Sequence, residues 1–182
     1  MQSRKKQSGM VLIEWLVVGV LIAIASVAAY NTLARETTVT ESSQMRDALV
    51  NLFAKVKAVK SQWGDYNGYT NASFYLSDEL LPASMKSTAA NQFVTPYSEN
   101  GLTFLPVSTV TNINGQTFNG TDGWLSVVIR NIPEGNCVDE VKRYLDKVIQ
   151  VNVGSTRIDG QAALDAACGA ASGTINITVI GG

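Results

Sequence analysis

One stretch near the N-terminus constrains this chain more than any other. Residues 10–30 (MVLIEWLVVGVLIAIASVAAY) are almost all apolar and contain a single charge, Glu14. A helix of about 20 apolar residues spans the ~30 Å hydrocarbon core of a bilayer, so the run predicts a membrane-spanning helix. A carboxylate within such a helix costs roughly 2.5–3.5 kcal/mol on insertion scales. The stretch is therefore either a signal-anchor helix with an incidental acid near its end, or a helix in which Glu14 has a role.

The residues before this run do not look like an ordinary signal peptide. Residues 1–9 (MQSRKKQSG) carry three cations, Arg4, Lys5 and Lys6, and no acid. These charges would hold this end in the cytoplasm and place everything after the apolar run outside the inner membrane. In a secretory signal the small residue of the cleavage site follows the apolar region, whereas Gly9 precedes it. Cleavage at Gly9 would remove the charges and leave the apolar helix in place.

A basic leader, Gly9, the apolar Met10, three further residues and Glu14 before a long apolar run resemble the prepilin peptidase site of type IV pilins. The resemblance implies cleavage between Gly9 and Met10 and methylation of the new N-terminal amine of Met10. It also implies that Glu14 neutralises the N-terminal amine of a neighbouring subunit during assembly. Such a pair at ~4 Å is worth several kcal/mol at an effective dielectric constant of about 20, which would offset the cost of the buried carboxylate.

A second helical pattern follows the apolar run. No proline occurs before Pro82, and apolar residues recur at steps of three and four along one face, which predicts an amphipathic continuation of the same helix to about Trp63. Gly64 is the expected C-cap. The residues of this stripe are Val39, Met45, Leu49, Leu52, Phe53, Val56, Val59 and Trp63.

Residues 64–123 are rich in turn-forming residues. Ser77 is the expected N-cap of a short helix over Asp78–Leu81, and short strands are expected at 102–104 and 107–110. Turns are expected at 112–115 and 119–120. Loops packed on the sheet are the simpler interpretation of this region, and a binding surface built from its Tyr and Asn residues is the alternative.

Three segments of this region look closest to type IVb pilins, a group that includes bundle-forming pilins and the thin-pilus subunits of conjugative plasmids. The nine-residue leader, in contrast, has the length found in type IVa. The three segments are the turn Tyr66–Tyr69, the pair Leu81–Pro82, and Val94–Tyr97.

The last third of the chain alternates strands and helices. Strands are expected at 124–130, 149–153 and 174–180, and a turn at 133–135. Asn136 is the expected N-cap of a helix whose apolar stripe continues to Val148. A second helix is expected to start after Asp159, to run through Cys168 and to stop at Gly169.

The two cysteines of the chain, Cys137 and Cys168, both fall in this last third. An even pair in an exported segment predicts a disulfide, with two buried free thiols as the alternative. Closing a loop of about 30 residues would contribute roughly 3–4 kcal/mol in the chain-entropy model. The bridge would tie the two helices to one edge of the sheet. A late cysteine followed by a C-terminal strand is the arrangement of type IVb pilins.

The sequence carries no recognisable catalytic set. Histidine is absent, which removes the commonest general base and metal ligand, and no phosphate-binding or dinucleotide glycine pattern occurs. The adjacent acids at 78–79 and 139–140 sit where helices are expected to begin, so the helix dipole explains them. Without the first nine residues the chain has 11 basic and 15 acidic side chains, which argues against nucleic acid as a partner. We therefore expect no enzyme activity, cofactor or metal site.

These observations predict an α+β protein of the type IV pilin fold. Residues 1–9 are the cleaved leader, and residues 10–30 are the transmembrane and filament-core half of a long helix, which protrudes from the head. Residues 31–182 form a globular head. In the head the amphipathic half of the helix packs on an antiparallel sheet, followed by a variable loop region at 64–123 and a disulfide-closed region at 124–182.

The expected function is that of a major pilus subunit, used for adhesion, aggregation or conjugation. The expected partners are identical subunits, prepilin peptidase, the inner membrane before assembly and the pilus assembly machinery, and the filament would lie outside the cell. The alternatives are a minor pilin or type II secretion pseudopilin, which share the N-terminus, and a membrane-anchored extracytoplasmic binding module.

Overall fold

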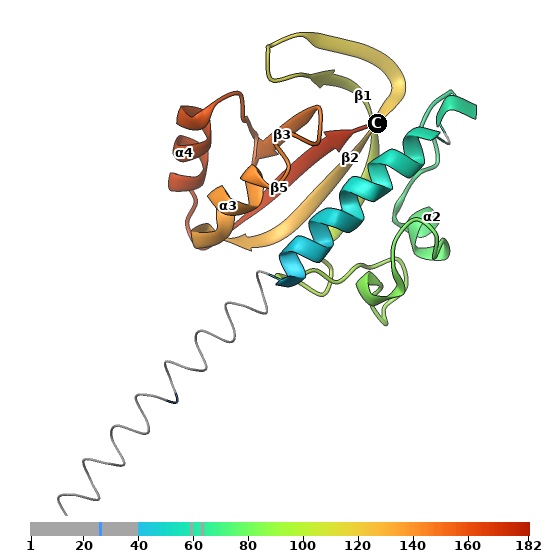
Figure 1. The fold of residues 1–182 in the computed structure, drawn as a ribbon, viewed down its shortest axis with the longest axis horizontal. Coiled ribbons are helices and arrows are strands. Elements are labelled where there is room, and N and C mark those ends of the chain that lie inside the picture. The colour runs from blue at the N-terminus through green and yellow to red at the C-terminus, as the bar shows by residue number, and fades with distance from the viewer. Residues whose placement is uncertain (1–25, 27–39, 59, 63) are drawn as a thin grey trace, which may run out of the picture. The chain divides into compact units, whose positions relative to one another are not determined.

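The computed structural model describes residues 26, 40–58, 60–62 and 64–182. The leader, the apolar run except Ser26, and residues 31–39 of the helix predicted to follow it lie outside these residues. Residues 41–182 form one compact unit, here called the head. It combines a five-stranded antiparallel sheet with short helices, as Figure 1 shows, so the predicted α+β class is confirmed.

The first element of the head is a helix over residues 40–58 and 60–62, here called the head helix. Its buried side chains follow the predicted stripe, and the opposite face is polar. Gly64, with φ of +91°, donates its N–H to the carbonyl oxygen of Lys60 at 2.7 Å and caps the helix as predicted. Val39, Val59 and Trp63 of the stripe lie outside the described residues. The buried members are Met45, Leu49, Leu52, Phe53 and Val56.

The head helix packs on one face of the sheet (Figure 1). Every second residue of the neighbouring strands points to this face, and the register aligns these residues into rows across the sheet, such as Phe104, Val127, Val179 and Val151. Pro106 lies on β1 at the edge of the sheet, where the loss of a backbone donor discourages pairing with another strand. The strand order is β1-β2-β5-β3-β4, with β1 at Leu102–Thr111, β2 at Thr117–Pro133, β3 at Gln150–Val153, β4 at Thr156–Arg157 and β5 at Thr174–Gly181.

Two short helices flank the sheet on the side of β3. The helix α3 (Cys137–Lys142) begins after Asn136 as predicted, behind a 3-10 turn at Glu134–Asn136, and α4 (Gln161–Gly169) ends at the predicted residue. However, α3 is shorter than its apolar stripe suggested. The chain turns after Lys142 and leads into β3, which pairs with β5. This pairing places Ile149 next to β5, where the Ile149 N–H donates to the carbonyl oxygen of Ile180 at 2.9 Å.

The helix predicted at Asp78–Leu81 is wrong. The helix of this region, α2, spans Asn71–Leu76, and Ser77 is its C-cap. Long-range contacts select the earlier segment: the ring of Phe74 packs 4.4 Å from that of Phe104, and the Asn71 side chain accepts the Phe104 N–H at 2.7 Å. A 3-10 helix, η1 (Ala83–Met85), follows. Asp78 therefore does not start a helix and instead pairs with Lys86, with 2.5 Å between Oδ1 and Nζ.

The β1–β2 hairpin also differs from the prediction in one place. The predicted turn at 112–115 connects the two strands, with Gly115 at φ of +81°. The predicted turn at 119–120 is wrong, because both residues lie within β2. Asn119 pairs with Thr109 on β1, where their side chains are joined by a hydrogen bond of 3.0 Å. The predicted strands at 102–104 and 107–110 both belong to β1, which also includes residues 105 and 106, and the register of β1 on β2 shifts between Val107 and Thr109.

Candidate functional site

The residues that the sequence singled out for processing and assembly are not placed by the structure. The leader charges Arg4, Lys5 and Lys6, the cleavage residues Gly9 and Met10, and Glu14 all lie outside the described residues. Within the described part of the chain, none of the helices is long and apolar enough to cross a membrane. The roles of these six residues therefore remain predictions.

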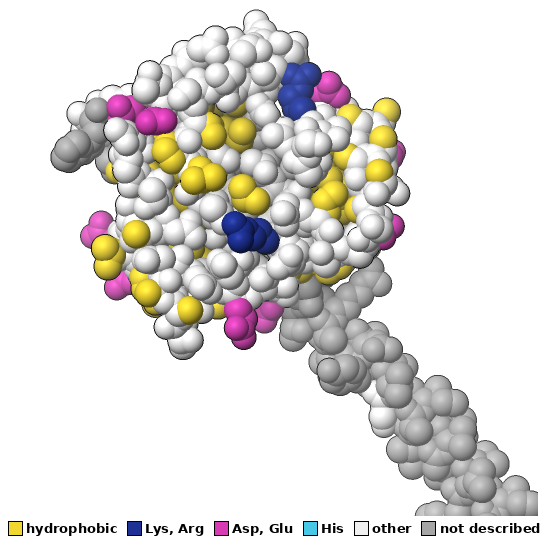
Figure 2. All heavy atoms as spheres, turned by 180° about the vertical axis from the view of Figure 1, so that it is seen from behind, with side chains coloured by type: hydrophobic (Ala, Val, Ile, Leu, Met, Phe, Trp, Pro, Cys, Tyr) yellow, Lys and Arg dark blue, Asp and Glu magenta, His cyan; other side chains and the backbone are white. Residues whose placement is uncertain are grey.

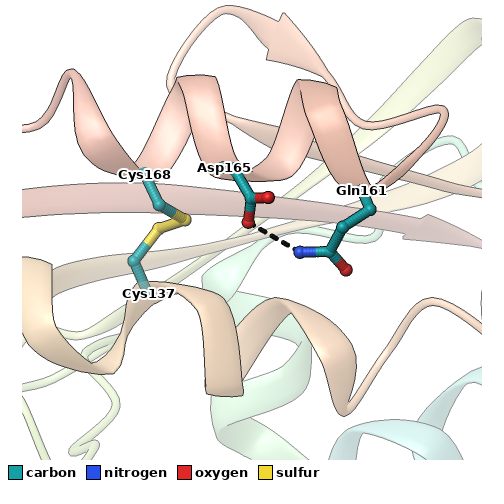
Figure 3. Close-up of a disulfide and its surroundings, with 4 residues drawn as sticks. All are labelled: Cys137, Gln161, Asp165 and Cys168. Atoms are coloured by element: carbon teal, nitrogen blue, oxygen red, sulfur yellow. Dashed lines mark hydrogen bonds between the residues drawn. A yellow bond between two sulfur atoms is a disulfide. The ribbon is translucent and has the colours of Figure 1, made fainter.

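The predicted disulfide is present. Cys137 at the start of α3 is bonded to Cys168 near the end of α4, as Figure 3 shows, and their Cα atoms are 5.7 Å apart. Both side chains are buried. One turn earlier on α4, Gln161 donates to Asp165 at 2.6 Å along the exposed side. The bridge links two residues that are 31 positions apart in the chain. The segment between them, which contains both helices, β3 and β4, is therefore a covalently closed loop beside β5.

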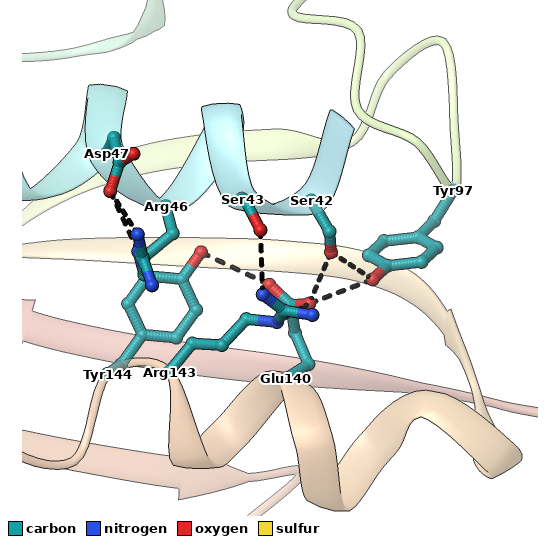
Figure 4. Close-up of polar contacts among 8 residues, drawn as sticks. All are labelled: Ser42, Ser43, Arg46, Asp47, Tyr97, Glu140, Arg143 and Tyr144. Atoms are coloured by element: carbon teal, nitrogen blue, oxygen red, sulfur yellow. Dashed lines mark hydrogen bonds and ion pairs between the residues drawn. The ribbon is translucent and has the colours of Figure 1, made fainter. Parts of the chain in front are cut away.

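A buried carboxylate, which the sequence did not identify, lies between the head helix and α3. Glu140 is 1% exposed, and its two oxygens accept hydrogen bonds from Ser42 at 2.7 Å, Tyr97 at 2.9 Å and Tyr144 at 3.2 Å (Figure 4). Arg143 lies on the same side, with Nε 3.5 Å from Glu140 Oε2. The four partners and Glu140 are here called the Glu140 cluster. It connects the first described turn of the head helix, the loop before β1, and the disulfide-linked helix α3.

The tyrosines of the cluster stay protonated over a wide pH range. Burial raises the pKa of Tyr97 to about 12, although its hydrogen bond with Ser42 acts in the opposite direction. Burial and the nearby Glu140 carboxylate raise the pKa of Tyr144 well above its ordinary value. Both hydroxyls therefore remain hydrogen-bond donors to the Glu140 carboxylate. These hydrogen bonds replace the water that the buried carboxylate has lost.

The sequence interpretation of Glu140 as a residue placed for the helix dipole was incomplete. Glu140 does lie in the first turn of α3, beside the exposed Asp139, but it is buried and bonded to distant residues. One local signal was available, since Arg143 and Tyr144 follow at the i+3 and i+4 positions and so share a helix face with it.

A groove on the surface lies at the far end of the β1–β2 hairpin. The pairing of β2 with β5 begins at Leu125, so the hairpin beyond this point overhangs the sheet. It is held to β3 by the Thr111 N–H, which donates to Gln150 Oε1 at 2.6 Å. A groove of about 450 Å³, here called the hairpin groove, opens between the hairpin and the chain that leads into β3. It is lined by Asn112, Ile113, Phe118, Trp124, Leu145, Val148 and Ile149.

Among the described residues, no group of three or more Cys, Asp or Glu side chains could hold a metal ion. On the face turned away from the viewer of Figure 1, Figure 2 shows hydrophobic atoms scattered among polar ones, with acidic side chains around the edge.

No protein-family model matches the sequence, and no curated protein matches it either. Function must therefore be inferred from the residues and their geometry.

Proposed function

We propose that the chain is the structural subunit of a type IV pilus, of the type IVb kind. It is made as a prepilin in the inner membrane, cleaved after Gly9 and assembled into an extracellular filament. The apolar run 10–30 is buried first by lipid and then by the same segment of neighbouring subunits. The heads form the outer shell of the filament.

The observation that carries the proposal is the match between the two halves of the chain. An apolar run with Glu14 near its start leads into an amphipathic helix whose buried stripe covers an antiparallel sheet. A disulfide closes the region before the last strand, which pairs in the middle of that sheet. The combination of a basic leader, a glutamate in an apolar run and a head of this architecture supports a pilin better than a simple membrane-anchored module.

The Glu140 cluster supports the same role mechanically. A filament subunit must transmit force between its core segment and its head without unfolding. Ser42, at the beginning of the described part of the head helix, donates a hydrogen bond to Glu140 on α3. The disulfide in turn joins α3 to α4. Polar and covalent links thus join the head helix to the C-terminal region of the head.

The test is Glu14→Ala in the full chain, expressed in a bacterium that assembles the pilus. The variant should be cleaved and inserted into the membrane as the unaltered chain is, but it should form no filaments, because the neighbour's amine loses its partner. Glu99→Ala, which removes an exposed acid of the head, is the matched control and should leave piliation unchanged. Normal filaments from Glu14→Ala would refute the assembly role. A subunit that is scarce in sheared filaments would be a minor pilin or pseudopilin.

A further inference from the structure

The outer edge of β1, here called the β1 edge, is the longer of the two edges of the sheet. β1 is the first strand in the order β1-β2-β5-β3-β4 and has 10 residues, whereas β4 at the opposite edge has 2. The residues of β1 (LTFLPVSTVT) include no charge, many are Val or Thr, and Leu105 is 49% exposed. A long, uncharged edge strand of this composition offers its free backbone groups as a template for a strand of another molecule.

The pairing with β2 determines which backbone groups of β1 face outward. The Arg130 N–H donates to the carbonyl oxygen of Gly101 at 2.8 Å, so these two residues form a hydrogen-bonded pair directly before the strand. In an antiparallel pair, inward-facing and outward-facing residues alternate along each strand. The backbone groups of Leu102, Phe104 and Pro106 therefore face away from β2, in the part of β1 that precedes the shift in register.

One side chain of α2 occupies this part of the β1 edge. The side chain of Asn71 accepts the Phe104 N–H at 2.7 Å and donates to the carbonyl oxygen of Leu102 at 3.1 Å. It thus accepts and donates as the backbone of a neighbouring strand would. Pro106, the next outward-facing residue, has no N–H. Each of the three outward-facing residues therefore lacks one of the two free groups that a further strand would need.

The far end of β1 is closed in a similar way. The Asn112 N–H donates inward, to the carbonyl oxygen of Gln116 at 2.9 Å, so the N–H of Thr111 faces outward. It donates to Oε1 of Gln150 on β3 at 2.6 Å. A side-chain amide from another element thus binds each end of the β1 edge, and Pro106 lies between them. Because β1 has no charge, these three residues replace the charged side chains that protect many edge strands.

We propose that Asn71 closes the β1 edge to strand addition and so prevents two copies of this chain from pairing through their β1 strands. The inference goes beyond the proposed function and does not depend on it, because its contacts all lie within the head. Asn71 is held in place, since its side chain also donates to the carbonyl oxygen of Asn91 at 3.1 Å and the nearby Phe74 is fully buried. Without the Asn71 amide, Leu102 and Phe104 would present complete pairing groups to a second copy.

The test is the mass of the full-length chain in a mild non-ionic detergent with micelles in excess, measured by light scattering after size-exclusion chromatography. Asn71→Ala should form dimers that the unaltered chain does not form. Ser73→Ala is the matched control on the same helix: it removes the hydrogen bond from Ser73 to the carbonyl oxygen of Gly68, at 2.6 Å, and should form no such dimers. Near-UV circular dichroism checks the fold. Asn71→Ser, whose hydroxyl is one bond shorter than the amide, replaces Asn71→Ala if the latter does not fold.

A second substitution identifies the surface through which the dimers form. Leu105→Lys, added to Asn71→Ala, places a charge on the β1 edge and should abolish the dimers. Leu76→Lys, added to Asn71→Ala instead, removes a leucine that is 84% exposed but lies on α2, and should leave the dimers unchanged. Equal loss of dimers in the two double variants would assign them to general surface hydrophobicity and would overturn the inference.

Amide hydrogen exchange measures the β1 edge directly. In dilute Asn71→Ala, where monomers prevail, the Phe104 N–H should exchange about tenfold or more faster than in the unaltered chain, because its acceptor is absent. The Thr111 N–H, which Gln150 still accepts, should exchange at an unchanged rate. At higher concentration the dimers should restore the protection of Phe104. Unchanged exchange at Phe104, faster exchange without dimers, or dimers from Ser73→Ala would each contradict the role of Asn71.

Discussion

Removal of the Glu140 carboxylate should be among the most damaging single changes in the head. Glu140→Ala leaves the hydroxyls of Ser42, Tyr97 and Tyr144 without their shared acceptor. It also leaves the guanidinium of Arg143, whose side chain is 21% exposed, without its ion-pair partner. The resulting cavity lies between the head helix and α3, where water has little access.

The expected magnitude follows from these contacts. Glu140→Ala should lower the free energy of unfolding by about 3–5 kcal/mol, because three hydroxyls lose their acceptor and a largely buried guanidinium loses its ion-pair partner. Glu140→Gln keeps the shape and one acceptor oxygen but loses the charge, so we expect a loss of about 1–3 kcal/mol. Ser42→Ala should cost about 1 kcal/mol, and its effect should be smaller once Glu140 is replaced, since the two residues interact directly.

The assay is urea unfolding of the full-length protein in a mild non-ionic detergent, followed by near-UV circular dichroism with the disulfide intact. Asp139→Ala is the matched control: it removes an acid from the same helical turn, but an exposed one, and should cost less than about 1 kcal/mol. A Glu140→Ala variant no less stable than Asp139→Ala would refute the structural role of the cluster.

Two further predictions concern the packing and the titration of the head. A Cβ atom at Gly181 would lie 2.9 Å from the ring of Phe53, so Gly181→Ala should lower the free energy of unfolding by about 1–3 kcal/mol. A Cβ atom at Gly135 would have no neighbour within 4 Å, so the control variant Gly135→Ala should lower the free energy of unfolding by less than about 0.5 kcal/mol. The folded state raises the pKa of Tyr97 from 10.0 to about 12, so the contribution of Tyr97 to stability is fully present below pH 10 and is lost between about pH 10 and pH 12. Measurements of the free energy of unfolding against pH should show this loss, and the loss should be smaller in Tyr97→Phe.

Features with a regular local pattern were predictable from the sequence. The buried stripe of the head helix repeats at steps of three and four, and β5 alternates along its length, so both could be located without tertiary information. The ends of the head helix and α4 carry glycines, and the only two cysteines form the expected bridge. In each case the signal lies within about ten residues or has one possible partner.

Features that depend on distant contacts were not predictable. The position of α2 is set by Phe74 and Asn71, whose partners lie on β1. The burial of Glu140 depends on Ser42 and Tyr97, which are 98 and 43 positions away in the chain. An acid in the first turn of a helix has the same local sequence whether it faces solvent or the core, so only the packing of three segments distinguishes the two cases. The hairpin groove likewise arises from the overhang of one hairpin past its neighbouring strand.

The most direct test of the proposed function is the N-terminal sequence of the mature protein recovered from filaments sheared off the cell surface. A pilus subunit processed as proposed begins at Met10, with a methyl group on its amine, and is the main protein of the preparation. A mature chain that begins at Met1, or at any residue other than Met10, would contradict the account.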